Sequence, residues 1–173
     1  MPLKLSASSG GSVTLEPTNT ASNYTLTVPA VSGQVQVQNN MPAFSAYSSS
    51  NQSISSLANT KVTLDVEVFD TNSNFSSSRF TPTIAGYYQI SYSIYYSSAF
   101  TYGIAKLYKN GGSITWSEVY GGAAATPNPV GSCLIYLNGS TDYVELYAQT
   151  NNNNTVSARV DLTWLSGVLV RAA

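Results

Sequence analysis

The stretch Arg79-Phe-Thr-Pro-Thr-Ile-Ala-Gly-Tyr-Tyr-Gln-Ile-Ser-Tyr92 decides the fold, because it joins a Phe-x-Pro turn to a strand of strict alternation. Successive side chains of a strand point to opposite faces of its sheet. The alternation therefore predicts one aromatic and aliphatic buried face, and one more polar face. The first face carries Tyr88, Ile90, Tyr92, Ile94 and Tyr96, and the second carries Tyr87, Gln89, Ser91, Ser93 and Tyr95.

Three other segments repeat with a period of two, which predicts further strands at 61–69, 143–148 and 156–164. Asn110-Gly111 predicts a tight hairpin turn, because both residues adopt positive φ at little cost. No segment has a helical repeat, so we expect an all-β fold. The side chains expected to face the core are Val62, Leu64, Val66 and Val68, then Val144, Leu146 and Ala148, and then Val156, Ala158, Val160, Leu162 and Trp164.

A series of motifs occurs in a characteristic order and spacing, from Pro42-Ala-Phe-Ser-Ala-Tyr47 to Ser166-Gly-Val-Leu-Val170. Between them lie the alternating segment Lys61-Val-Thr-Leu-Asp-Val-Glu-Val-Phe69, the Arg79–Tyr92 stretch, Ala105-Lys-Leu-Tyr-Lys-Asn-Gly111 and Gly131-Ser-Cys-Leu-Ile-Tyr-Leu-Asn-Gly-Ser-Thr-Asp-Tyr-Val-Glu-Leu146. Over residues 42–171 the chain resembles the globular-head family of the first complement component, within the tumour necrosis factor superfamily. The resemblance implies a jelly-roll β-sandwich that assembles as a homotrimer and binds partners. The turn at 138–142 departs from the family, whose turn reads Gly-Asp.

Residues 1–40 have a different character, with very short apolar segments broken by Gly, Pro and Asn. These segments contain too few apolar residues to close an independent core. The string from Val13 to Gly33 resembles a segment of bacteriophage tail-fibre and virion appendage proteins. That resemblance implies a β-rich stalk or docking segment at 1–40 that contacts other virion proteins, followed by a head at 41–173. A partly disordered leader is the alternative.

The composition of the 173 residues disfavours several classes of function. Charged residues make up 9%, against roughly 25% in ordinary soluble domains. The net charge is −1, so we expect no nucleic-acid partner. With no histidine and one cysteine, the chain has no internal disulfide and few ligands for a metal. Cys133 lies in an alternating strand, which indicates a small buried hydrophobe rather than a reactive thiol.

The start Met1-Pro-Leu-Lys-Leu-Ser6 lacks the apolar core of a secretory signal peptide. The chain has no run of about 18 apolar residues, so we expect no membrane insertion. Its surface is nevertheless rich in Ser, Thr, Asn and Tyr, as in extracellular β-proteins. A virion protein made in the host cytoplasm and released by lysis reconciles these observations.

We expect neither an enzyme nor a cofactor, since no catalytic constellation occurs. Asp65 and Glu67 share one predicted strand face with Lys61, which we expect to neutralise them. Asp70-Thr-Asn-Ser-Asn74 has the oxygen spacing of a calcium loop but lacks the following glycine and glutamate. An Asx turn is favoured there, and calcium binding stays open.

Thirteen tyrosines against five phenylalanines suggest surfaces that are packed yet partly wet. We predict an intersubunit seam at Tyr87, Tyr95, Tyr143 and Tyr147. A saccharide-stacking platform is the competing interpretation.

The sequence thus predicts a bacteriophage virion appendage protein whose trimeric head contacts the host surface, either a glycan or a protein. Candidate contact residues lie in two loop-rich stretches, 116–129 and 151–155, and are Trp116, Tyr120, Asn128 and Asn152. The alternative for these stretches is solvated turns with Trp116 buried. The alternative function is a capsid decoration or fibre-capping protein without a receptor. A polysaccharide-degrading enzyme is disfavoured.

Overall fold

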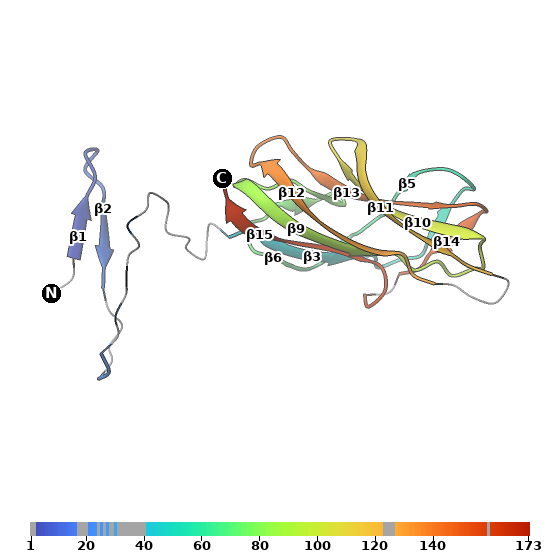
Figure 1. The fold of residues 1–173 in the computed structure, drawn as a ribbon, viewed down its shortest axis with the longest axis horizontal. Helices are drawn as coiled ribbons and strands as arrows, with labels where there is room; N and C mark the ends of the chain where they lie inside the picture. The colour runs from blue at the N-terminus through green and yellow to red at the C-terminus, as the bar shows by residue number, and fades with distance from the viewer. Residues whose placement is uncertain are drawn as a thin grey trace. The chain divides into compact units, whose positions relative to one another are not determined.

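The computed structural model describes residues 3–16, 21–23, 25, 27, 30, 41–122, 127–158 and 160–173. The chain divides into two compact units, Met1–Val35 and Gln36–Ala173 (Figure 1). The described residues form strands and turns without any helix, so none forms a helix able to span a membrane. The predicted all-β fold is confirmed. The boundary predicted between residues 1–40 and 41–173 adjoins residues outside the described ranges and stays a prediction.

The described part of the N-terminal unit is a single hairpin of β1 (Leu3–Ser6) and β2 (Ser12–Leu15). The register places Leu3 opposite Leu15 and Leu5 opposite Val13, so the four apolar side chains share one face. Each is more than half exposed. An isolated two-stranded hairpin is marginally stable in water. The other short apolar segments noted within residues 1–40 lie partly or wholly outside the described residues.

The second unit, called the head below, is a jelly-roll sandwich of two antiparallel sheets, as predicted (Figure 1). A short ribbon of β14 (Asn154–Val156) and β4 (Gln52–Ile54) lies beside them. In spatial order the five-stranded sheet consists of β12 (Val130–Asn138), β9 (Ala85–Ser93), β15 (Trp164–Ala172), β3 (Ala43–Tyr47) and β6 (Val66–Asp70). The six-stranded sheet consists of β11 (Gly112–Tyr120), β10 (Tyr102–Lys109), β13 (Val144–Thr150), β8 (Arg79–Phe80) and β7 (Phe75–Ser76), with β5 (Thr60–Lys61) also paired to β13.

The core lies between the sheets, where the alternation of β9 and β13 predicted it. From the five-stranded sheet, Tyr88, Ile90 and Tyr92 are fully buried, and Ile94 and Tyr96 continue the buried series beyond the strand. Val144, Leu146 and Ala148 of β13 are also fully buried. Phe44 stacks on Phe80 with ring centroids 4.1 Å apart, which links the two sheets. Burial of each valine, leucine, isoleucine or phenylalanine side chain in this core contributes roughly 1.5–3 kcal/mol.

The strand predicted at 61–69 is wrong, because this segment crosses from one sheet to the other. β5 pairs with β13 in the six-stranded sheet, and β6 pairs with β3 in the five-stranded sheet. Between them Val62 and Leu64 are buried, and the Leu64 amide donates to Ser78 Oγ at 2.8 Å. The crossing interrupts the pleat, so Val68 is 57% exposed instead of buried.

The strand predicted at 156–164 is wrong for a similar reason. β14 ends at Val156 and β15 begins at Trp164, with a loop between them. Val160 is exposed on this loop, and Thr163, expected to face outward, is fully buried. Thr163 Oγ1 accepts a hydrogen bond from the Tyr95 amide at 3.0 Å. Arg159 lies outside the described residues.

Two predicted local features are present. Asn110 and Gly111 have φ of +52° and +81°, as a tight hairpin turn requires. Cys133 packs against the core on β12, and burial raises the pKa of its thiol, which disfavours the reactive thiolate.

The two ends of the sandwich differ in what they carry. At one end the Pro42 carbonyl accepts from the Leu169 amide, and the C-terminal Ala173 amide donates to the Ala85 carbonyl. At the opposite end lie the segment after Tyr96 and the segment after Thr150, joined where the Asn151 amide donates to the Tyr102 carbonyl. Figure 1 shows the C terminus and the β14 ribbon at these opposite ends. We call the second end the loop end.

Candidate interaction surfaces and the loop-end cleft

Four strands of the five-stranded sheet, β12, β9, β15 and β3, form a continuous outward surface. We call this surface the five-strand face, after its sheet. The register aligns its residues in rows across the strands. Its charged residue is Arg171, at the end of β15. The other outward residues are uncharged: Val130, Ser132, Leu134 and Tyr136 on β12; Tyr87, Gln89, Ser91 and Ser93 on β9; Trp164, Ser166 and Val168 on β15; and Ala43, Ser45 and Tyr47 on β3.

Large apolar side chains on the five-strand face are exposed next to one another. Tyr87 and Tyr136 are directly opposite in the register, pack edge to face at 5.5 Å and remain 44% and 42% exposed. In the next row Leu134 is 59% exposed and Val168 is 42% exposed, on either side of Gln89. A contiguous exposed apolar patch of this kind marks an interaction surface.

A row of small side chains lies beside this patch. Ser45, Ser166, Ser91 and Ser132 are aligned across β3, β15, β9 and β12. The Ser91 hydroxyl donates to the Ser132 hydroxyl at 3.3 Å. Short side chains in this row let another surface approach the sheet closely.

The outward side of the six-stranded sheet is charged and internally paired. Glu145 is buried there between Lys61 Nζ at 2.7 Å and Arg79 at 2.8 Å. Burial raises the pKa of Glu145, but the hydrogen bonds from Lys61 and Arg79 outweigh it and hold the pKa below 4.5. On the same side, Lys106 donates to Asn59 and Gln149 at 2.7 and 2.8 Å. The charged groups named here therefore have partners within the chain, whereas Trp116, aligned with Lys106 on the same side, is exposed.

The four tyrosines of the predicted seam fall on opposite sides of the sandwich. Tyr87 lies on the five-strand face, and Tyr95 follows β9 and is half-buried. Tyr143 lies under the Arg79 guanidinium, 3.7 Å from the ring centroid, and Tyr147 stacks on Tyr108 at 4.0 Å. The seam stays a prediction, and the structure does not bring these four residues together on one face.

The acidic pair expected on one strand face with Lys61 is arranged differently. Lys61 binds Glu145, not Asp65 or Glu67. Asp65 instead accepts hydrogen bonds from the amide and hydroxyl of Ser49, which lower the pKa of its carboxyl. The prediction failed because the chain crosses between sheets after Lys61, which separates these side chains.

The Asp70–Asn74 segment forms the favoured Asx turn. Asp70 Oδ2 accepts from the Phe75 amide at 2.6 Å, and Oδ1 accepts from the Asn72 amide at 3.3 Å. Ser73 within the turn has φ of +53°. In the described residues no group of three or more His, Cys, Asp or Glu side chains is arranged to hold a metal.

The candidate host-contact residues lie in different surroundings. Trp116, on β11, is 62% exposed. The alternative interpretation of these stretches, solvated turns with Trp116 buried, is therefore wrong for this residue. Tyr120 ends β11 at the loop end and is 74% exposed. Asn128 is half-buried between two prolines. Asn152 is half-buried in a loop-end cleft.

The asparagine run at the loop end mostly holds the loops together. Asn151 Oδ1 accepts from the amides of Thr101 and Tyr102 at 2.8 and 3.2 Å. Asn153 Oδ1 accepts from the Ser56 amide at 2.8 Å. Asn154 Nδ2 donates to the Ser98 carbonyl at 2.9 Å. Most of the amide groups that the sequence offers for recognition are therefore already used within the head.

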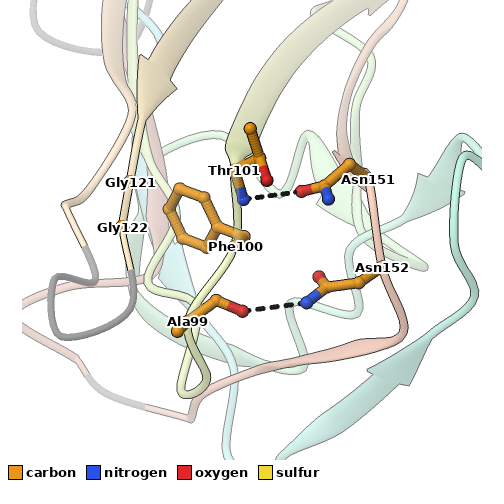
Figure 2. A pocket seen from close by; sticks show the side chains of 7 residues that line it. All are labelled: Ala99, Phe100, Thr101, Gly121, Gly122, Asn151 and Asn152. Atoms are coloured by element: carbon orange, nitrogen blue, oxygen red, sulfur yellow. Dashed lines mark hydrogen bonds between the residues drawn. The ribbon is translucent and has the colours of Figure 1, made fainter.

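Asn152 is the exception within this run. Its Nδ2 donates to the Ala99 carbonyl at 2.9 Å, but its Oδ1 is buried without a hydrogen-bond partner. It lines a cleft of about 230 Å³ together with Ala99, Phe100, Thr101, Gly121, Gly122 and Asn151 (Figure 2). Phe100 and Thr101 were not among the predicted site residues, because both precede β10 in a turn that has no sequence periodicity.

Comparisons with known proteins agree with this architecture. No family model matches the chain, and no curated sequence is similar to it. The globular domain of zebrafish complement 1qA superposes with a TM-score of 0.57 at 16% identity, covering 76% of this chain and 99% of the other. The head therefore shares the jelly-roll fold of this domain. The Eiger TNF of S. frugiperda superposes with a TM-score of 0.62 at 9% identity, covering 77% of this chain and 93% of the other.

A viral structure is also similar to the head. The vertex protein P5 of phage PRD1 gives a TM-score of 0.51 at 14% identity, covering 77% of this chain and 98% of that one. At these identities the similarity concerns the fold. The resemblance noted over residues 42–171 is therefore confirmed as a fold, whereas the tail-fibre resemblance of residues 1–40 stays a prediction.

Proposed function

We propose that this chain is a structural appendage protein of a bacteriophage virion, with a homotrimeric head. The observation that carries the assembly is the five-strand face, which has a contiguous exposed apolar patch beside a row of serines and carries one charged residue, Arg171. Charged residues are depleted where protein interfaces are fully buried, and aromatic residues are enriched there. Tyr87, Leu134 and Tyr136 supply this chemistry. The six-stranded sheet, with Glu145, Lys61 and Arg79 paired internally, suits the solvent side of such an assembly.

A viral context is supported by the fold shared with the PRD1 vertex protein and by the composition of the chain. The apolar face of the β1–β2 hairpin supports attachment through the N-terminal unit. Leu3, Leu5, Val13 and Leu15 have no cover within the described hairpin. Three copies, or another virion protein, would bury this face. In this proposal the loop end of the head contacts the host.

A decoration or capping protein without a receptor is the second candidate. It is favoured by the asparagine run, because Asn151, Asn153 and Asn154 already bind neighbouring loops. Antibody labelling of intact particles tests the viral assignment, and we expect gold particles at one defined virion part. Purified protein added to host cells separates the two candidates. Slower phage adsorption supports host contact, whereas unchanged adsorption at saturating protein favours decoration.

A further inference from the structure

We propose that the loop-end cleft binds one neutral sugar residue of a host-surface glycan. This inference rests on the proposed host contact and names its chemistry. The cleft is formed by Ala99–Thr101, Gly121, Gly122, Asn151 and Asn152 (Figure 2). It lies at the end of the head opposite Pro42 and the C terminus.

The buried Oδ1 of Asn152 is the first reason. The Ala99 carbonyl accepts from Asn152 Nδ2, so rotating the amide by 180° would set two oxygens against each other. The orientation of the amide is therefore fixed, and Oδ1 is left as an acceptor. An unpaired buried acceptor costs about 1–3 kcal/mol. A ligand hydroxyl that donates to Oδ1 removes this penalty.

A complementary donor lies on the neighbouring residue. Both hydrogen bonds of the Asn151 side chain within the described residues use Oδ1, which accepts from the Thr101 and Tyr102 amides. Nδ2 is left as a donor on the same wall as Asn152. A hydroxyl both donates and accepts, so adjacent hydroxyls of one sugar ring can satisfy Asn152 Oδ1 and Asn151 Nδ2 together.

The size and charge of the cleft define the class of ligand. One water molecule needs roughly 10–15 Å³ of volume measured in this way, so a cleft of about 230 Å³ has room for many waters. Its seven lining residues carry no charge, so they offer no counter-ion to a phosphate or carboxylate. Phe100 also lines the cleft, but it is only 4% exposed, so most of its ring belongs to the core. The size and the lack of charge favour a neutral hexose over an acidic sugar.

The glycines of the cleft differ in a way that allows a clean test. A Cβ on Gly121 would lie 2.5 Å from the Phe100 carbonyl oxygen, so this position is closed by packing. A Cβ on Gly122 would meet no heavy atom within 4 Å. Gly122→Val therefore adds a side chain in open space at the border of the cleft without entering the core. Gly112→Val is the matched control at the other end of β11, where the nearest atom, the Lys109 carbonyl oxygen, is at an ordinary 3.6 Å.

The experiment is ligand-observed NMR on the full-length protein with glucose, galactose, mannose, N-acetylglucosamine and N-acetylgalactosamine, each at millimolar concentration. Glucuronic acid and sialic acid serve as charged counterparts. We expect at least one neutral sugar to bind wild type and Gly112→Val, and binding to fall at least tenfold in Gly122→Val at an unchanged melting temperature. Absence of neutral-sugar binding overturns the inference. So does full binding by Gly122→Val, or a preference for the charged sugars.

A second readout separates this inference from the host contact on which it rests. If purified protein slows phage adsorption, but protease treatment of the cells abolishes its binding and no sugar binds, the receptor is a protein. The inference then fails while the host contact stands. If a neutral sugar binds in the cleft but adsorption is unchanged, the cleft assignment holds and the proposed host contact fails.

Discussion

Lys61 Nζ lies 2.7 Å from the carboxylate of Glu145, which is buried on the outward side of β13. Arg79 contacts the same carboxylate at 2.8 Å and covers the Tyr143 ring. The pair joins β5 to β13, and Arg79 joins β8 to β13, so one carboxylate holds three strands of the six-stranded sheet. The cluster also explains why this side of the sandwich does not need another subunit to neutralise Glu145.

Replacing Glu145 by Gln should destabilise the head. The change keeps the shape but leaves Lys61 and Arg79 without a counter-charge. Both cations are partly exposed and regain water, so we expect a loss of about 1–3 kcal/mol, below that for a fully buried pair. Denaturant unfolding measures the loss, with Glu118→Gln on exposed β11 as the control. Equal midpoints for wild type and Glu145→Gln would refute the structural role of the cluster.

Lowering the pH should reduce the difference in stability between wild type and Glu145→Gln. The pKa of folded Glu145 is held below its ordinary 4.5, so the unfolded chain takes up the proton first as pH falls. The stabilisation is complete well above pH 4.5 and is lost as pH falls through the folded pKa. Melting temperatures of wild type and Glu145→Gln should therefore converge in acid. A difference that stays constant down to full acid unfolding would show that Glu145 does not titrate as described.

Gly131→Ala should strain the core at the edge strand β12. A Cβ there would lie 2.2 Å from the ring of Tyr92, which is fully buried. Overpacking of this kind costs about 1–3 kcal/mol. Gly122→Ala is the control, since its Cβ would meet nothing within 4 Å. Calorimetry should give a lower melting temperature for Gly131→Ala alone, and a wild-type value for that variant would contradict the packing of Tyr92.

Deletion of residues 1–40 should leave a folded head that no longer enters virions. The described hairpin of this unit presents its four apolar side chains, Leu3, Leu5, Val13 and Leu15, to solvent, as expected of a segment that is buried only after assembly. Circular dichroism checks the fold, and immunoblotting of purified particles checks incorporation. Normal amounts of truncated protein in particles would rule out an anchoring role.

The sequence predicted those parts of the fold where one strand stays in one sheet. Alternation placed Tyr88 and Ile90 in the core, and also Leu146, because β9 and β13 keep their pleat over their whole length. Alternation failed at 61–69 and 156–164, where the chain leaves a sheet. A period of two reports which side chains share a face, but it carries no information about where the strand ends.

The candidate sites were predicted less completely. Tyr120 and Asn152 were identified from residue type and do lie at the loop end. Phe100 and Thr101 were not, because they reach the cleft through a turn whose conformation depends on Asn151, fifty residues away in the chain. Glu145 was assigned to the polar face of its strand, and its burial follows from Lys61 and Arg79, which tertiary structure brings to it.

A charged side chain introduced on the five-strand face should dissociate the proposed trimer into monomers. In the proposed trimer Tyr87 is covered by another subunit, and an isolated aspartate there would lose its hydration at a cost of several kcal/mol. Tyr87→Asp should therefore lower the mass in solution. Tyr120→Asp makes the same exchange at an exposed position of the other sheet and should keep the wild-type mass.

The mass of the full-length protein in solution tests the central claim most directly. Size-exclusion chromatography with light scattering at micromolar concentration should give three times the 18.4 kDa of one chain. A mass of 18.4 kDa would mean that the five-strand face is stable in water, and the trimeric appendage would be contradicted.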